Sequence, residues 1–157
     1  MKNRISFFLI VLLISNLSLS VISCKKKKKE EVTPAEIVTS LNLTLDAPKG
    51  KQDVIALFND MAGVNNKTAP TTLTLDANTL YTGTITLEDE SVTPKKDVSD
   101  DYTITYRATG TDLTITNGKT PQVTTRSTTS ATNASLEIIL TKNGNTSTVK
   151  FPLVVRP

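Results

Sequence analysis

Apolar and polar residues alternate along most of the chain after residue 37, and this period of two is typical of β-strands with one buried and one wet face. Threonine fills many of the polar positions, because its β-branched side chain suits the exposed face of a strand. The pattern predicts eight or nine short strands, over residues 41–45, 53–58, 71–75, 80–89, 101–109, 112–116, 122–130, 134–142 and 147–156.

Short strands separated by turn residues predict an all-β fold, a single antiparallel β-sandwich. Tyr81, Ile85 and Leu87 should lie on the buried face of their strand. No segment shows a sustained period of 3.6 residues, so helix should be minor, and residues 61–70 and 94–101 should form the long loops. A β-barrel has the same pattern and stays the structural alternative.

The last third of the chain carries three more specific signals. Residues 122–130 are almost all polar, so we expect an edge strand there. The sequence Asn-Gly-Asn at 143–145 tolerates positive φ and predicts a hairpin between the last two strands. Pro152 has no N–H group, which predicts an edge position or a bulge in the final strand.

Residues 1–23 have the three parts of a secretory signal sequence. Lys2 and Arg4 give a positive start, an apolar run follows over 5–14, and small or polar residues precede Cys24. The apolar run is shorter than the roughly 20 residues that span a bilayer core. We therefore expect cleavage before Cys24, with an uncleaved membrane anchor as the alternative.

The segment Val21-Ile22-Ser23-Cys24 resembles the lipobox of bacterial lipoproteins, in which aliphatic or small residues precede a lipidated cysteine. The resemblance implies that Cys24 begins the mature chain and carries three acyl chains, the first of them attached through a thioether. One acyl chain alone binds a membrane only marginally, at about 0.8 kcal/mol per buried methylene, so three chains would give a lasting anchor. An ordinary buried thiol or an intermolecular disulfide is the alternative for Cys24.

Five lysines at 25–29 and two glutamates at 30–31 follow, so residues 24–35 read as a charged, extended tether. Lysines near anionic head groups gain roughly 1 kcal/mol each. A lipidated cysteine followed by lysine and paired acidic residues also resembles the export signal of Bacteroidetes-type surface lipoproteins. The resemblance implies display on the outer face of the outer membrane, with a solvated tether lacking any sorting role as the alternative. Residues 36–157 remain for the β-sandwich domain.

The charge distribution argues against a nucleic-acid partner. The whole chain has a net charge of +3, but residues 35–157 hold 11 Lys or Arg and 13 Asp or Glu, a net charge of −2. No basic patch with interleaved aromatic residues, the footprint of a nucleic-acid binder, is visible. Cys24 is the only cysteine, so the domain of about 120 residues has no internal disulfide and depends on burial and backbone pairing.

Residues 75–81, with the sequence LDANTLY, resemble the tyrosine corner of fibronectin type III and related immunoglobulin-like domains. In such corners the phenol, here that of Tyr81 six residues after Leu75, hydrogen-bonds to backbone just upstream and holds the crossing between two sheets. The resemblance implies an immunoglobulin-like sandwich. The strand order stays open, because the fibronectin corner precedes the sixth of seven strands, whereas about three predicted strands precede it here.

The longer run 73–101 is similar to a group of uncharacterised Bacteroidetes-type lipoproteins. Their mature chains carry L-x-x-N-T-x-Y-x-G, an apolar strand, a turn, a proline and an acidic segment. Some members then have a His followed by aromatic residues, but residues 101–104 here read Asp-Tyr-Thr-Ile. A metal or haem role implied by that His therefore does not carry over, and the resemblance supports the location of the protein more than any mechanism.

Residues 58–66 lie where that group has a D-x-D-G-D-G-like loop, a common arrangement of calcium ligands. Asp60 and Gly63 are present, but Ala62 and Val64 stand in the places of the next two acids and offer no side-chain oxygen. Calcium takes six to eight oxygen ligands. We therefore favour a plain turn-rich loop, with Asp60 as a calcium candidate that is not adopted.

The chain has no histidine, so neither a Ser-His-Asp or Cys-His catalytic system nor a His-ligated metal site can form. The acidic clusters 88–90 and 100–101 raise the question of glycoside hydrolysis, which needs two carboxylates on opposite sides of a bond. Neighbours on a strand point to opposite faces, so adjacent acids do not form such a pair. We expect no catalytic residue and no cofactor.

The sequence thus predicts a lipid-anchored protein of the cell envelope, held in the outer membrane through Cys24 and facing outward. We expect a non-catalytic binding or accessory module whose partner is an extracellular ligand or another envelope protein. Two alternatives stay open. One is a hydrolase of extracellular glycan that uses carboxylates from residues 88–101, and the other is a structural spacer with no ligand.

Overall fold

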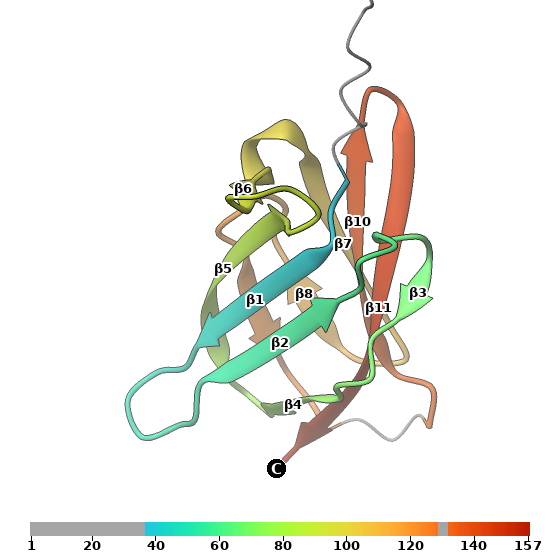
Figure 1. Cartoon of the computed structure of the whole chain (residues 1–157). Helices are drawn as coiled ribbons and strands as arrows, with labels where there is room; N and C mark the ends of the chain where they lie inside the picture. The colour runs from blue at the N-terminus through green and yellow to red at the C-terminus, as the bar shows by residue number, and fades with distance from the viewer. Residues whose placement is uncertain (1–36, 129–131) are drawn as a thin grey trace, which may run out of the picture. The chain divides into compact units, whose positions relative to one another are not determined.

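The computed structural model describes residues 37–128 and 132–157, which form two β-sheets packed against each other (Figure 1). The predicted signal sequence, lipobox and tether lie outside the described residues. The prediction of an all-β sandwich with minor helix is confirmed. In chain order the elements are β1 (Ser40–Asp46), β2 (Val54–Asn59), β3 (Lys67–Thr68), β4 (Leu73–Asp76), β5 (Leu80–Asp89), β6 (Lys96–Asp97), the 3-10 helix η1 (Ser99–Asp101), β7 (Thr103–Thr109), β8 (Leu113–Ile115), β9 (Gln122–Thr125), β10 (Ser135–Lys142) and β11 (Asn145–Arg156).

The first sheet has the strand order β2-β1-β5-β9-β8, and β6 pairs with the far end of β5. All of its pairs are antiparallel. The second sheet has the order β3-β11-β10-β7, with β4 also paired to β11. Here β3 and β4 run parallel to β11. We expected a wholly antiparallel sandwich, and these two strands depart from that expectation. After β2 the chain crosses to the second sheet, where β3 and β4 lie beside β11 and run in the same direction as β11.

Two very short strands explain why the described residues hold more strands than the alternation predicts. β3 lies within the expected loop 61–70, and β6 lies within the expected loop 94–101. Each has two residues, which is too short to leave an alternating pattern in the sequence.

The core lies between the sheets and consists of alternate residues of the longer strands. Its fully buried members are led by Tyr81 and Phe151, and include Leu41, Leu43, Leu45, Leu73, Leu75, Leu87, Leu136, Ile138, Leu140 and Val98. A one-residue slip would turn such side chains to the solvent, so their burial fixes the register. All buried apolar residues described lie between Val38 and Val155, within the compact unit Ala35–Pro157, so this unit carries a core of its own.

The expectation of an edge strand over residues 122–130 is wrong. The strand is β9, four residues long, and it lies between β5 and β8 in the interior of the first sheet. Gly83 of β5 lets the start of β9 come this close, because it has no side chain. A Cβ atom at Gly83 would lie 2.7 Å from the ring of Pro121, the residue just before β9. A polar strand is tolerated at this position because its backbone pairs on both sides and its outward face is wet.

The β10–β11 hairpin turns at Asn143 and Gly144, both with positive φ, as the sequence predicts. Pro152 occupies neither an outer edge nor a bulge. The next residue, Leu153, donates its N–H to Ala134 on the β10 side, so the nitrogen of Pro152 faces the β3/β4 side. At that point β3 has ended at Thr68 and β4 has not begun, so no hydrogen bond is lost.

Candidate binding surface

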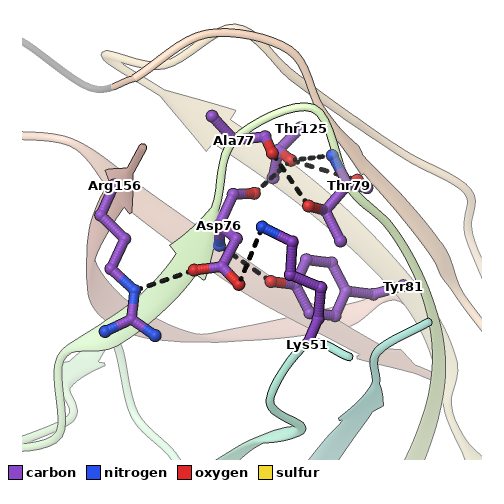
Figure 2. Close-up of polar contacts among 7 residues, drawn as sticks. All are labelled: Lys51, Asp76, Ala77, Thr79, Tyr81, Thr125 and Arg156. Atoms are coloured by element: carbon purple, nitrogen blue, oxygen red, sulfur yellow. Dashed lines mark hydrogen bonds and ion pairs between the residues drawn. The ribbon is translucent and has the colours of Figure 1, made fainter. Parts of the chain in front are cut away.

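The corner between β4 and β5 is closed by a tyrosine (Figure 2). The Tyr81 side chain is fully buried, and its hydroxyl accepts a 2.8 Å hydrogen bond from the backbone N–H of Asp76. Burial raises the pKa of Tyr81. Leu75 is also fully buried, and Asn78 turns the chain with a φ of 52°. These are the residues at which the sequence placed a tyrosine corner, and the contact links β4 of one sheet to β5 of the other.

Thr125 of β9 completes this corner, a role that its sequence pattern did not predict. Its hydroxyl lies 2.6 Å from the carbonyl of Asp76, to which it donates, and accepts a 3.0 Å hydrogen bond from the N–H of Thr79. The side chain is buried, although three of the four residues of the strand are polar. Val123 is the one apolar residue of β9, and it is buried on the same face as Thr125. One apolar residue does not make an alternating pattern, so its position two residues before Thr125 was the only signal in the sequence.

The carboxylate of Asp76 lies beside two cations (Figure 2). Arg156 Nε is 2.8 Å from one oxygen, and Lys51 Nζ is 3.5 Å from the other. The hydrogen bond from Arg156 lowers the pKa of Asp76, and the same bond raises the pKa of Arg156. An ionised carboxylate has no proton to donate, so this cluster serves as a structural joint between β4, the end of β11 and the β1–β2 loop.

Asp60, the calcium candidate, forms an ion pair with Lys67 and accepts a 2.8 Å hydrogen bond from the N–H of Ala62. The bond from Lys67 is the main cause that lowers the pKa of Asp60. Gly63 completes the turn with a φ of 83°. Within the described residues no group of three or more His, Cys, Asp or Glu is arranged to hold a metal ion. The contacts of Asp60 are those of a turn-closing, cation-paired residue.

The acidic residues between 88 and 101 do not share one environment. Asp89 is buried and accepts a 2.9 Å hydrogen bond from the N–H of Ser91. A hydrogen bond from the hydroxyl of Ser99 lowers the pKa of Asp97. Three further carboxylates each pair with a lysine of their own: Glu88 with Lys95, Asp100 with Lys119, and Asp101 with Lys142. The carboxylates of this segment are therefore held by separate partners and are not gathered in one cluster.

No tyrosine or phenylalanine ring of the described residues is fully exposed. Phe58 and Phe151 are buried like Tyr81, whereas Tyr102 and Tyr106 are half-buried. The hydroxyl of Tyr106 donates a 2.9 Å hydrogen bond to the carbonyl of Gly118, and burial raises its pKa. The described aromatic rings, which could otherwise stack on a ligand such as a sugar, are therefore largely occupied in packing.

A small cavity of about 140 Å³ opens where the described chain begins, beside the β10–β11 hairpin. Its wall includes Val38, Val64, Tyr102, Leu140 and Ser147. Sites for small molecules usually measure roughly 300–1,000 Å³. The cavity is therefore large enough for a single side chain or a few waters rather than for a metabolite.

Threonine, asparagine and glutamine side chains gather on the outer side of the first sheet, and we call this surface the threonine face. The exposed Asp46 lies at its margin, opposite Thr82. The rows of the threonine face run across β1, β5 and β9, and its members are Asn42, Thr44, Thr82, Thr84, Thr86, Gln122 and Thr124. Asn42 lies opposite Thr86, and Thr44 lies opposite Thr84. All seven side chains are exposed or half-buried. Their hydroxyls and carboxamides offer donors and acceptors at the regular spacing of a sheet.

Comparison with protein-family models, with curated proteins and with solved structures finds no match. Among the described residues there is no helix of the length and hydropathy needed to cross a membrane. The threonine face is therefore identified from its geometry alone.

Proposed function

We propose that this chain is a lipid-anchored protein of the bacterial cell envelope, displayed on the outer membrane, that works by binding rather than by catalysis. The threonine face is the observation that carries the binding proposal. It is an array of hydroxyl and carboxamide groups held on a sheet, with Asp46 at its margin opposite Thr82. Such a surface suits an uncharged, hydrogen-bonding partner outside the cell, either a ligand or another envelope protein.

The anchor proposal is supported by Cys24 at the end of an apolar, signal-like segment and by the lysines that follow it. The domain has no other cysteine, so a thiol-specific modification of the mature chain has a single possible site. The surface location is supported by the resemblance of residues 24–31 to the export signal of surface lipoproteins.

The anchor is tested by following the full chain in cells fed with labelled palmitate. We expect the wild type to carry label and to remain with the outer membrane, and Cys24→Ala to lose the label. The Cys24→Ala protein should also keep the mass of the uncleaved precursor. Incorporation of label into Cys24→Ala would contradict lipidation at this residue.

Display is tested by adding protease to intact cells. Degradation of the domain, with a periplasmic protein left whole, is expected of an outward-facing lipoprotein. Survival of the domain while known surface proteins are cleaved would refute outward display but would leave the lipid anchor standing.

The binding face is tested by affinity capture from envelope fractions. Thr84→Lys places a charge in the middle of the threonine face and should abolish capture of the partner. Thr74→Lys is a matched control, because Thr74 is also an exposed threonine of a strand but belongs to the other sheet. Capture that is unchanged by Thr84→Lys would refute this face as the site. If nothing is captured, the structural spacer replaces the binding module.

A further inference from the structure

The sandwich protects its strand edges, with one exception. β8 has three residues, β3 and β6 have two each, and β4 has four. β7 is longer, but the N–H of Gly118 donates to the carbonyl of Ile104, and Asn117 Oδ1 accepts from the N–H of Tyr106. Short or covered edges are the usual means by which proteins avoid pairing with other chains. The remaining edge is β2, which among the described strands pairs only with β1.

β2 has none of the features that normally protect an edge. Its six residues, Val-Ile-Ala-Leu-Phe-Asn, include no charge, no proline and no glycine. Large apolar side chains project into solvent from this strand and from Met61, two positions after its end: Ile55 is 55% exposed, Leu57 54% and Met61 57%. Half of the six exposed large apolar residues of the described chain thus lie within seven positions. A long, flat, apolar edge is a template for strand pairing.

Ile55 and Leu57, whose side chains are exposed, also direct their backbone groups away from β1. The N–H of Asp60 donates a hydrogen bond to the carbonyl of Thr39, and Phe58, two residues earlier, lies opposite Leu41. Phe58 and Asp60 therefore both direct their backbone groups towards the β1 side. Direction alternates along a strand, so the backbones of Ile55, Leu57 and Asn59 face away from β1. Their N–H and C=O groups are the ones that an added strand would bind.

Charge and side-chain matching favour a second copy of the same strand. In an antiparallel pairing centred on Ala56, Ile55 lies opposite Leu57 of the other copy, and Asp53 lies opposite Asn59. Shifting the centre to Ile55 would set Asp53 against Leu57, and shifting it to Leu57 would set Ile55 against Asn59. The register centred on Ala56 is the one of these three that joins both aliphatic pairs and leaves the carboxylate beside an amide, with no like charges in contact.

We propose that two copies of this protein associate through β2, antiparallel and about a two-fold axis at Ala56, so that their first sheets join into one continuous sheet. The pairing is isologous, as most homodimer contacts are. It would bring the two threonine faces onto one continuous sheet, on either side of the paired β2 strands. The interface is smaller than that of an obligate dimer, so association is concentration-dependent, and anchoring on a membrane raises the local concentration of both copies. Only this last step rests on the proposed function.

Self-association is tested on residues 36–157 by analytical ultracentrifugation over a range of concentrations. We expect a monomer–dimer equilibrium that Leu57→Lys weakens by at least about tenfold, because it removes both Ile55–Leu57 pairs and sets two like charges diagonally across the axis. Val154→Lys is the matched control, since Val154 is an exposed aliphatic residue of the other sheet. Circular dichroism and thermal unfolding confirm that each variant is folded.

Cysteine pairing tests the register, and the domain contains no cysteine that could interfere. Directly opposed residues of a hydrogen-bonded pair lie about 5.5 Å apart between Cα atoms, within the range of a disulfide. A mixture of an Ile55→Cys protein and a differently tagged Leu57→Cys protein should form mixed disulfide dimers. Each protein alone should form far fewer.

Three results would overturn the proposal. The first is a monomer at every concentration up to the solubility limit. The second is equal weakening by Leu57→Lys and Val154→Lys. The third is disulfide formation by either single variant alone as fast as in the mixture. None of these results bears on the lipid label at Cys24, so failure here is distinguishable from failure of the proposed function.

Discussion

The hydroxyl of Tyr81 lies 2.8 Å from the backbone nitrogen of Asp76, from which it accepts a hydrogen bond, and the side chain of Tyr81 is fully buried. The two residues are five positions apart but belong to different sheets, because the chain crosses the sandwich between them. The domain lacks a disulfide, so this bond and its neighbours secure the crossing by burial and backbone pairing.

Tyr81→Phe should lower the free energy of unfolding by about 1–3 kcal/mol, because it removes the acceptor of the Asp76 N–H inside the protein. Urea denaturation of residues 36–157 measures the change. Tyr106→Phe is the control: its hydroxyl also bonds to backbone, at Gly118, but in a half-buried place where water can substitute. A loss for Tyr81→Phe no larger than for Tyr106→Phe would contradict the role of the corner.

Thr125→Val should cost about 1–3 kcal/mol despite its near-identical shape, because the Thr79 N–H and the Asp76 carbonyl both lose their partner. Thr124→Val, one residue earlier and pointing outward, should change the free energy of unfolding by less than about 0.5 kcal/mol. The same denaturation experiment compares them. Equal effects would mean that Thr125 contributes through strand propensity alone.

The Asp76–Arg156 pair should make stability depend on pH in the acidic range. The pKa of Asp76 is lowered in the folded protein, so ionised Asp76 stabilises the fold at pH values above its ordinary pKa of 3.8. This contribution is lost as the pH falls through the lowered folded value. We therefore expect Asp76→Asn to destabilise the protein near neutral pH, and the difference from wild type to shrink in strong acid.

Thermal unfolding across the acidic range measures this difference. Arg156→Gln removes the main partner and should abolish most of the same pH dependence. If the difference between Asp76→Asn and wild type stayed constant down to strongly acidic pH, the carboxylate would not be held ionised by these cations.

Gly83→Ala should destabilise the domain by about 1–3 kcal/mol through overpacking. A Cβ atom would lie 2.7 Å from Pro121 Cγ and 3.0 Å from Leu45 Cδ2, at the point where β9 approaches β5. Thr84→Ala, exposed on the same strand, is the control and should have a much smaller effect. If Gly83→Ala left the free energy of unfolding unchanged, β9 would be able to move away from β5 without loss of stability.

Local patterns predicted the parts of the fold that depend on neighbours in sequence. The alternation identified the long strands and their buried faces, and Asn143-Gly144 identified the last hairpin. Leu75 and Tyr81 were recognised because a corner joins residues only five or six positions apart. The partner Thr125 was missed because it reaches this corner from 46 to 49 residues away, on a strand without an apolar pattern.

Alternation by itself determined that this chain is all-β and which side of each long strand is buried, because burial of one face leaves a period of two in the residues. It left a β-sandwich and a β-barrel both open. It could not determine which strand lies beside which. Only the tertiary structure placed β9 in the interior, set β3 and β4 parallel to β11, and left β2 as an uncovered edge. Strand neighbours depend on packing between distant segments, as when Gly83 admits Pro121, and such contacts leave no local period in the chain.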